Sequence, residues 1–254
     1  SRQYAPLPTR IYGGLINNLT AELDDIEANA HRLLAALRDA FAAYWQEKKR
    51  GRYGSVGPEL IETYGLKDYL ARRGFNINQR ALCSLSGAVT EVFLVCKLQI
   101  HVFSGMRHDE ARMLPYHCMV KKNGRNGRSH SLIAGITTKF NKGRRLRTHW
   151  VTTDQEGFRA IRLSQQFASV VYESLGITPS KADALKDEFP LFPSTDYLPW
   201  GRRKDVPRQR IQTADKDLSK AKEPLHARLL PVIEEEDIAE LDEIDPFRAW
   251  RCEK

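Results

Sequence analysis

Residues 78–104 hold the feature that most constrains the fold, a long apolar segment that ends at Ser104-Gly105. As a helix, its apolar side chains would cover most of the circumference, so we expect it to be buried on several sides. Four polar residues interrupt its most apolar part, which makes it too polar for a bilayer span and ordinary for a core helix: Glu91, Lys97, Gln99 and His101. The rest of the chain must therefore supply apolar surfaces that surround one central helix.

Residues 15–49 supply one such surface. Their apolar residues recur every three or four positions, which predicts a long amphipathic helix. Before it, residues 1–14 contain two prolines and a Gly-Gly pair and are expected to form an extended lead-in. Short helices are predicted over 58–74, ending at Gly74.

The pattern changes from helical to extended between residues 117 and 153. Three segments rich in β-branched residues are separated by Asn-Gly and Asn-Lys-Gly sequences, which favour hairpin turns. They predict antiparallel strands over 117–121, 129–139 and 144–153. A helix capped by Asp154 and ending before Gly176 is expected to follow.

The order of these segments predicts an α+β fold, mostly helical with a small three-stranded antiparallel sheet. The 254 residues allow one large domain or two small ones. We expect a helical lead-in region over 1–77, a central part over 78–176, and a Pro-rich, charged region over 177–254. Within the last region, residues 177–231 are typical of an excursion over the surface, and 232–245 of one short acidic helix.

Positive charge is unevenly distributed. The net charge is +8, from 40 basic and 32 acidic residues, and eight of those acids lie in 232–245, which has no base. The rest of the chain therefore has 40 bases against 24 acids, a net charge of +16. This net positive charge favours a polyanionic partner. A solvated basic surface with no partner, or an acidic protein partner, would fit the same charge pattern. We hypothesise that the acidic segment screens the basic surface when no nucleic acid is bound.

The positive charge is densest between residues 111 and 153, which contain ten bases and no acid. Lys and Arg side chains near phosphates release condensed counterions, so such a sheet favours nucleic acid binding, whether DNA or RNA. His149 adds a group that can contact a sugar or a base. The expected nucleic-acid contacts are Lys121, Lys122, Arg125, Arg128, Lys142, Arg144, Arg145, Arg147 and His149.

The segment Ser104-Gly-Met-Arg107-His-Asp-Glu110 follows the apolar helix. The glycine ends that helix, and Arg107 stands at the start of the next, with Glu110 one turn further on. A guanidinium suits bidentate contact with a phosphate diester, and a carboxylate beneath it would hold it. A plain ion pair between residues three apart is the structural alternative.

These residues resemble the first motif of the tyrosine recombinases, the phage-integrase family. In that family an apolar helix is followed by Thr/Ser-Gly, a hydrophobic residue, Arg, two further residues and Glu, as at Ser104 to Glu110 here. A three-stranded sheet comes next, with a lysine in the hairpin between its second and third strands, where this chain has Lys139. A helix then follows the sheet. The resemblance covers about residues 80–175 and implies the fold of the first part of a recombinase catalytic domain.

The resemblance also implies roles for matching residues. Arg107 would stabilise the phosphorane-like transition state, and Glu110 would orient the motif. Lys139 would be the general acid toward the leaving 5′ oxygen, with Lys142 as the alternative within the same hairpin. The implied reaction is site-specific DNA cleavage and rejoining through a 3′-phosphotyrosyl link, without metal or small-molecule cofactor.

The chain departs from the family in its second motif. No His-x-x-Arg sequence occurs, His226-Ala-Arg228 has the wrong spacing, and Tyr172 and Tyr197 precede any place where that motif would stand. Either the chain is truncated before the second motif and the nucleophile, which its end at Lys254 favours, or it is an inactive relative that binds nucleic acid or assists assembly.

The remaining features predict a cytoplasmic, nucleoid-associated protein. No signal peptide is recognised, and the four cysteines lack paired spacing, which is typical of a reducing compartment. No metal-ligand spacing is recognised around residues 108–118. We expect double-stranded DNA as the partner, homo-oligomerisation on DNA as the family implies, and no membrane.

Overall fold

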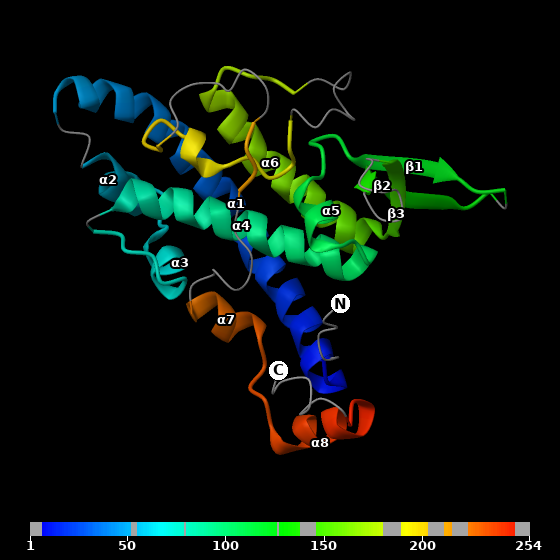
Figure 1. Cartoon of the computed structure of the whole chain (residues 1–254). Coiled ribbons are helices and arrows are strands. Elements are labelled where there is room, and N and C mark those ends of the chain that lie inside the picture. The colour runs from blue at the N-terminus through cyan, green and yellow to red at the C-terminus, as the bar shows by residue number, and fades with distance from the viewer. Residues whose placement is uncertain are drawn as a thin grey trace.

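The computed structural model describes residues 7–51, 55–78, 80–125, 127–137, 146–179, 189–202, 211–214 and 223–246. Helices surround one central helix, and a small antiparallel sheet lies at one end of it (Figure 1). The α+β prediction is therefore confirmed. The helical elements are α1 (Thr9–Lys49), α2 (Val56–Thr63), α3 (Lys67–Arg72), α4 (Ala81–Ser104), α5 (His108–Arg112), the π-helical turn η1 (Asp154–Phe158), α6 (Arg159–Ser174), the 3₁₀ turn η3 (Thr195–Tyr197), α7 (Glu223–Leu229) and α8 (Glu235–Ile244).

The apolar segment forms α4, which packs against α1, α2 and α6. The expectation that this segment is too polar to span a bilayer is wrong, because α4 is long and apolar enough to do so by length and composition. However, 72% of its most apolar stretch is buried inside the fold, as in the core helix of a soluble protein. The helix ends where predicted, because Gly105 adopts a left-handed conformation with φ of 67°. Residues from all three regions distinguished in the sequence contribute to the buried core.

The prediction of an extended lead-in is wrong from Thr9 onward, because α1 begins there and includes the Gly-Gly pair. The structure gives a reason for the second glycine. A Cβ at Gly14 would overlap the ring of Pro231, whereas a Cβ at Gly13 would meet nothing within 4 Å. Gly14 therefore allows the C-terminal part of the chain to lie close against α1.

The sheet has the order β1-β2-β3, with both pairs antiparallel. Its strands are β1 (Met119–Asn123), β2 (Ser129–Thr137) and β3 (Leu146–Thr152). The predicted cap of the following helix is displaced by one residue. Thr153, and not Asp154, accepts a hydrogen bond from the backbone of Glu156, at 3.1 Å.

The segment after α6 is more than a surface excursion, because its described residues 189–202 are packed into the core. Leu191, Phe192 and Leu198 are almost fully buried. The backbone N–H of Leu191 donates to the carbonyl of Leu114, at 2.8 Å, and attaches the segment to the chain just after α5. The prolines and mixed charges of this segment predicted a surface position. The segment is buried instead because the apolar residues between the prolines pack into the core.

One network of two arginines and buried carboxylates joins the C-terminal part to the core. Arg73, which is 1% exposed, contacts Glu22, Asp25 and Glu91 at 2.5–3.0 Å. Arg228 of α7 reaches the same Glu22 and Glu91, each at 2.6 Å. The two arginines thus share carboxylates from α1 and α4, and α7 is joined to both helices.

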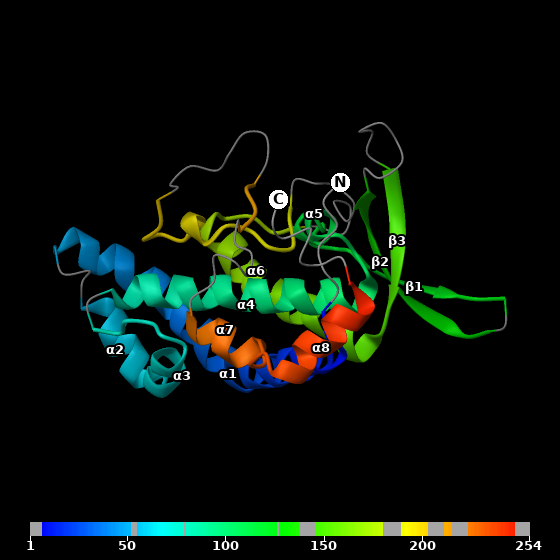
Figure 2. The ribbon, with the colours of Figure 1, turned by 60° about the horizontal axis from the view of Figure 1, so that its bottom comes forward.

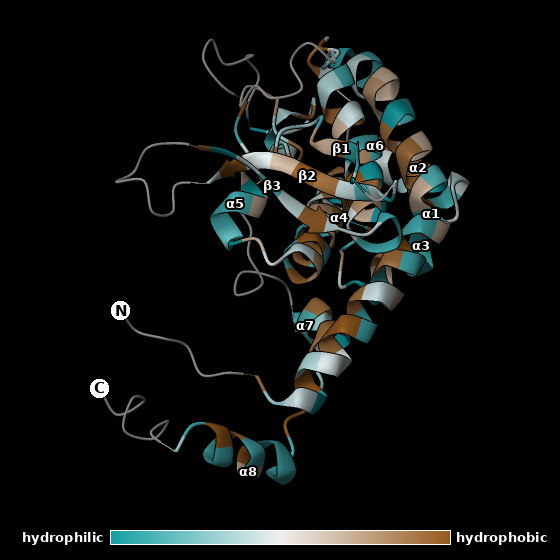
Figure 3. Ribbon diagram, turned by 90° about the vertical axis from the view of Figure 1, so that its right-hand side faces the viewer, coloured by the Kyte–Doolittle hydropathy of each residue, from teal (hydrophilic) through white to brown (hydrophobic). Residues whose placement is uncertain are grey.

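The acidic segment forms a helix, as predicted, but it does not screen the sheet. Asp237 and Glu234 of α8 pair with Arg10 at the start of α1, and Glu240 accepts hydrogen bonds from Thr9. Figures 1 and 3 show α8 at the end of the molecule away from the sheet. Arg10 lowers the pKa of Asp237, so the pair stays charged at neutral pH.

Candidate nucleic-acid interface

Arg107 is presented at the start of α5 by the turn that ends α4. Gly105 reverses the chain, and Met106, which is 1% exposed, anchors the turn in the core. Arg107 itself has an extended backbone at the N-cap of α5 and is exposed. Within the described part of the chain, no carboxylate lies within ion-pair distance of its guanidinium. As far as the described residues are concerned, the group is therefore open to an external anion.

Glu110 holds this turn in a way that the sequence did not predict. Its Oε2 accepts a hydrogen bond from the backbone N–H of Arg107, at 2.9 Å, and not from the guanidinium. Its Oε1 accepts the hydroxyl of Thr137, at 2.6 Å. Thr137 is the last residue of β2, so one carboxylate connects the start of α5 to the β2–β3 hairpin. The expected ion pair between Arg107 and Glu110 is therefore replaced by a hydrogen bond from the backbone of Arg107 to Glu110.

The outer face of the sheet brings together three of the expected contacts. Residues opposite one another on antiparallel strands point to the same side. The register pairs Lys122 with His130, and places Arg147 and His149 two residues apart on β3. These four side chains are exposed. His130 did not stand out in the sequence, because only the register places it beside Lys122.

Lys121 lies apart from this group. It points to the opposite side of β1 and pairs with Asp154, with 2.5 Å between Nζ and Oδ2. Ser131, its cross-strand neighbour, donates to the same carboxylate. These two hydrogen bonds lower the pKa of Asp154. The positive charge of Lys121 is thus matched by Asp154, whereas Lys122 has no ion-pair partner among the described residues.

The other expected contacts are divided between a turn and a hairpin. Arg125 and Arg128 are exposed in the turn that joins β1 to β2, which projects beyond the helices (Figure 2). Four residues of the β2–β3 hairpin lie outside the described residues: Lys139, Lys142, Arg144 and Arg145.

Tyr172 and Tyr197, the described tyrosines in the second half of the chain, are buried in the core. Tyr172 is fully buried, its hydroxyl donates to the carbonyl of Pro190 at 2.7 Å, and burial raises its pKa. Tyr197 is 3% exposed, and its hydroxyl accepts the backbone N–H of Gln212. Both hydroxyls are thus engaged in hydrogen bonds with the backbone of the segment after α6.

Two of the cysteine thiols are buried and protonated. Burial raises the pKa of Cys96 and of Cys118 to about 12, so both remain protonated. An apolar surrounding sequence favours a buried thiol at Cys83, but Cys83 is exposed. Among the described residues, no three His, Cys, Asp or Glu side chains converge as a metal site would require.

Comparisons with models of protein families, with curated proteins and with solved structures gave no match. The interpretation of the interface therefore depends on the residues themselves and on their arrangement.

Proposed function

We propose that this chain is the DNA-contacting first part of a tyrosine recombinase catalytic domain. The observation that carries the proposal is the connection from Arg107 through Glu110 to Thr137. It fixes the backbone of Arg107 beside the end of β2, where the segment with Lys139 begins. The guanidinium of Arg107 is exposed and has no ion-pair partner among the described residues. A site that acts on a phosphodiester needs fixed cations around one phosphate, and this connection holds two cation-bearing segments together.

The chemistry follows from these groups. Arg107 would bind the non-bridging oxygens of the scissile phosphate and stabilise the additional negative charge of the transition state. A tyrosine hydroxyl, which matching positions of this sequence do not provide, would attack phosphorus and form the 3′-phosphotyrosyl bond. The bond from phosphorus to the 5′ oxygen would break, and that oxygen would take a proton from Lys139.

DNA would reach this phosphate along the basic surfaces of the sheet. Lys122, Arg147 and His149 share one exposed face, and Arg125 and Arg128 extend it at the β1–β2 turn. Contacts of this kind with the backbone position a duplex without reading its sequence.

The test is the Arg107→Ala variant of the full-length protein with a nicked duplex that traps the covalent complex. We expect formation of that complex to fall at least about 100-fold, because one group that stabilises charge in a transition state contributes about that much. Duplex affinity should change by less than about tenfold. Arg112→Ala is the matched control, since Arg112 lies on the same helix and faces Asp109 at 3.4 Å. Normal cleavage by Arg107→Ala would overturn the proposal.

A second candidate, an inactive nucleic-acid-binding protein on a recombinase-like scaffold, is favoured by one observation. The chain has no His-x-x-Arg sequence, and Tyr172 and Tyr197 are engaged in the core. Salt-sensitive duplex binding by the full-length protein without any covalent complex would select this candidate over the enzyme.

A further inference from the structure

The β1–β2 hairpin extends away from the rest of the molecule (Figures 1 and 2). Between Lys121 and Ser131 its described residues are exposed, apart from the half-exposed Gly124. Residues 121–131 consist of four Lys or Arg, two Asn, two Gly, two Ser and one His. Because they include no apolar and no acidic side chain, this arm suits a negatively charged partner with many hydrogen-bonding groups, and not an apolar protein surface.

Hydrogen bonds hold the arm in shape at both of its ends. At its base, Asp154 accepts from Lys121 and from Ser131, which face each other on β1 and β2. At its tip, the backbone N–H of Gly124 donates to the carbonyl of Arg128, at 2.8 Å. A two-stranded hairpin alone is only marginally stable in water, so these contacts reduce the entropy that binding would otherwise cost.

The dimensions of the arm match the major groove of B-form DNA. Two paired strands lie about 4.8 Å apart, and the major groove, about 12 Å wide, admits a two-stranded ribbon with its side chains. The minor groove, about 6 Å wide, is too narrow for such a ribbon. The major groove of double-stranded RNA is too narrow for side chains to read. The arm therefore fits a DNA duplex and not a double-stranded RNA.

Arg125 lies at the tip of the arm. It is exposed and has no ion-pair partner among the described residues. About 13 Å of extended chain separates it from Lys121, which exceeds the major-groove depth of about 8.5 Å. Arg125 can therefore reach the floor of the groove, where a guanidinium binds O6 and N7 of guanine through two hydrogen bonds. Lys122 and His130, which face each other across the two strands, remain at the level of the phosphates.

The strand β2 connects this arm to the Arg107 site. It runs from Ser129, near the tip, to Thr137, whose hydroxyl donates to Glu110. Its nine residues span about 30 Å, whereas one turn of B-form DNA measures about 34 Å. Base pairs at the tip would therefore lie within about one helical turn of a phosphate bound by Arg107.

We propose that the β1–β2 hairpin enters the major groove beside the cleavage site and that Arg125 reads a guanine there. Lys122 and His130 contact phosphates along the same groove. The inference rests on the proposed DNA-binding function. It adds a source of sequence preference, because Arg125 contacts a base and not the backbone.

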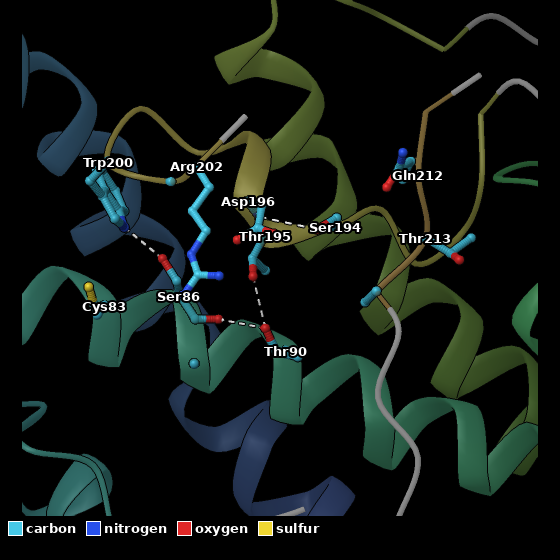
Figure 4. A pocket seen from close by; sticks show the side chains of 13 residues that line it. Cys83, Ser86, Thr90, Ser194, Thr195, Asp196, Trp200, Arg202, Gln212 and Thr213 are labelled. Atoms are coloured by element: carbon cyan, nitrogen blue, oxygen red, sulfur yellow. Dashed lines mark hydrogen bonds between the residues drawn. The ribbon is translucent and has the colours of Figure 1, made fainter. Parts of the chain in front are cut away.

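The experiment selects bound duplexes, with the full-length protein, from a pool randomised over about 20 base pairs, or two turns of DNA. It compares Arg125→Lys with Arg202→Lys as the matched control. Arg202 is exposed and lies at a polar pocket between α4 and η3, outside the hairpin (Figure 4). Lysine keeps the positive charge but lacks the planar fork that binds guanine through two hydrogen bonds.

We expect the unmodified protein to select a guanine that Arg125→Lys no longer selects. Discrimination at that position should fall about tenfold or more, while the salt dependence of binding stays the same. Arg202→Lys should select the same sequences as the unmodified protein. Replacing the selected guanine with a deazaguanine that lacks N7 removes an acceptor of the major groove. It should weaken binding by the unmodified protein and have little effect on Arg125→Lys.

Each other outcome has a definite meaning. If Arg125→Lys keeps the guanine preference, or if the unmodified protein binds duplexes without any preference, the role of the hairpin is overturned while the DNA-binding function stands. Unchanged affinity for the deazaguanine duplex would overturn the major-groove contact. No duplex binding by the unmodified protein would contradict the proposed function itself, and this inference with it.

Discussion

Glu110 accepts hydrogen bonds from two segments that are distant in the sequence, and this determines where Arg107 lies. The backbone of Arg107 is held by Oε2 and the end of β2 by Oε1. A carboxylate that paired with the guanidinium would have neutralised it. Because Glu110 binds the backbone instead, the position of the arginine is fixed while its charge stays free for a phosphate.

Thr137→Val tests this connection with a side chain of almost the same shape. We expect it to destabilise the protein by about 1 kcal/mol, because it removes one hydrogen bond to a charged acceptor that is partly exposed. Hydrogen exchange at the amide of Arg107 should become faster. Thr137→Ser keeps the hydroxyl and should behave like the unmodified protein in both measurements. Unchanged exchange in Thr137→Val would mean that the carboxylate does not connect the two segments.

At the scale of elements, local signals in the sequence predicted most helices and strands. The apolar pattern defined α4, and left-handed Gly105 and Gly176 end α4 and α6 as expected. Contacts between distant residues could not be predicted in this way. Gly14 lies in a helix because Pro231 approaches it, and the role of Thr137 appears only once β2 is placed beside α5. Strand register decided which bases share a face, and periodicity alone does not fix register.

The glycine pair of α1 gives a prediction about the C-terminal segment. Gly13→Ala should stabilise the protein by up to about 1 kcal/mol, because alanine favours a helix and nothing lies near the new methyl group. Gly14→Ala should destabilise the protein and open the segment with Pro231 to proteolysis. Thermal unfolding and limited proteolysis measure both effects. Equal stabilisation by the two substitutions would show that Pro231 does not pack on α1.

The ion pairs of Arg228 with Glu22 and Glu91 should contribute strongly to the attachment of α7 to the core. Arg228→Ala removes one of two arginines that contact buried Glu22 and Glu91, and should cost about 3 kcal/mol in the free energy of unfolding. Arg38→Ala breaks a half-exposed pair with Glu173 and should cost less than about 1 kcal/mol. Denaturant unfolding compares the two variants, and similar costs would contradict the buried network.

At the scale of the molecule, the acidic helix α8 and the exposed basic residues of the sheet lie in different places. Acidic α8 pairs with Arg10 at one end, whereas Lys122, Arg147 and His149 remain exposed on the sheet. Lys121 is matched by Asp154. A duplex that approaches the face with Lys122 and Arg147 therefore meets two cations that have no ion-pair partner among the described residues, and binding should depend steeply on salt.

The most direct test of the proposed interface is duplex affinity between about 50 and 200 mM salt. The Lys122→Ala/Arg147→Ala variant is compared with Lys67→Ala/Arg80→Ala, which removes two exposed charges from the region of α3 and the start of α4. We predict salt-sensitive binding by the unmodified protein, a log–log dependence less steep by about 2 in the sheet variant, and no such change in the control. Equal effects of both variants, or no binding at the lowest salt, would contradict DNA binding on the sheet.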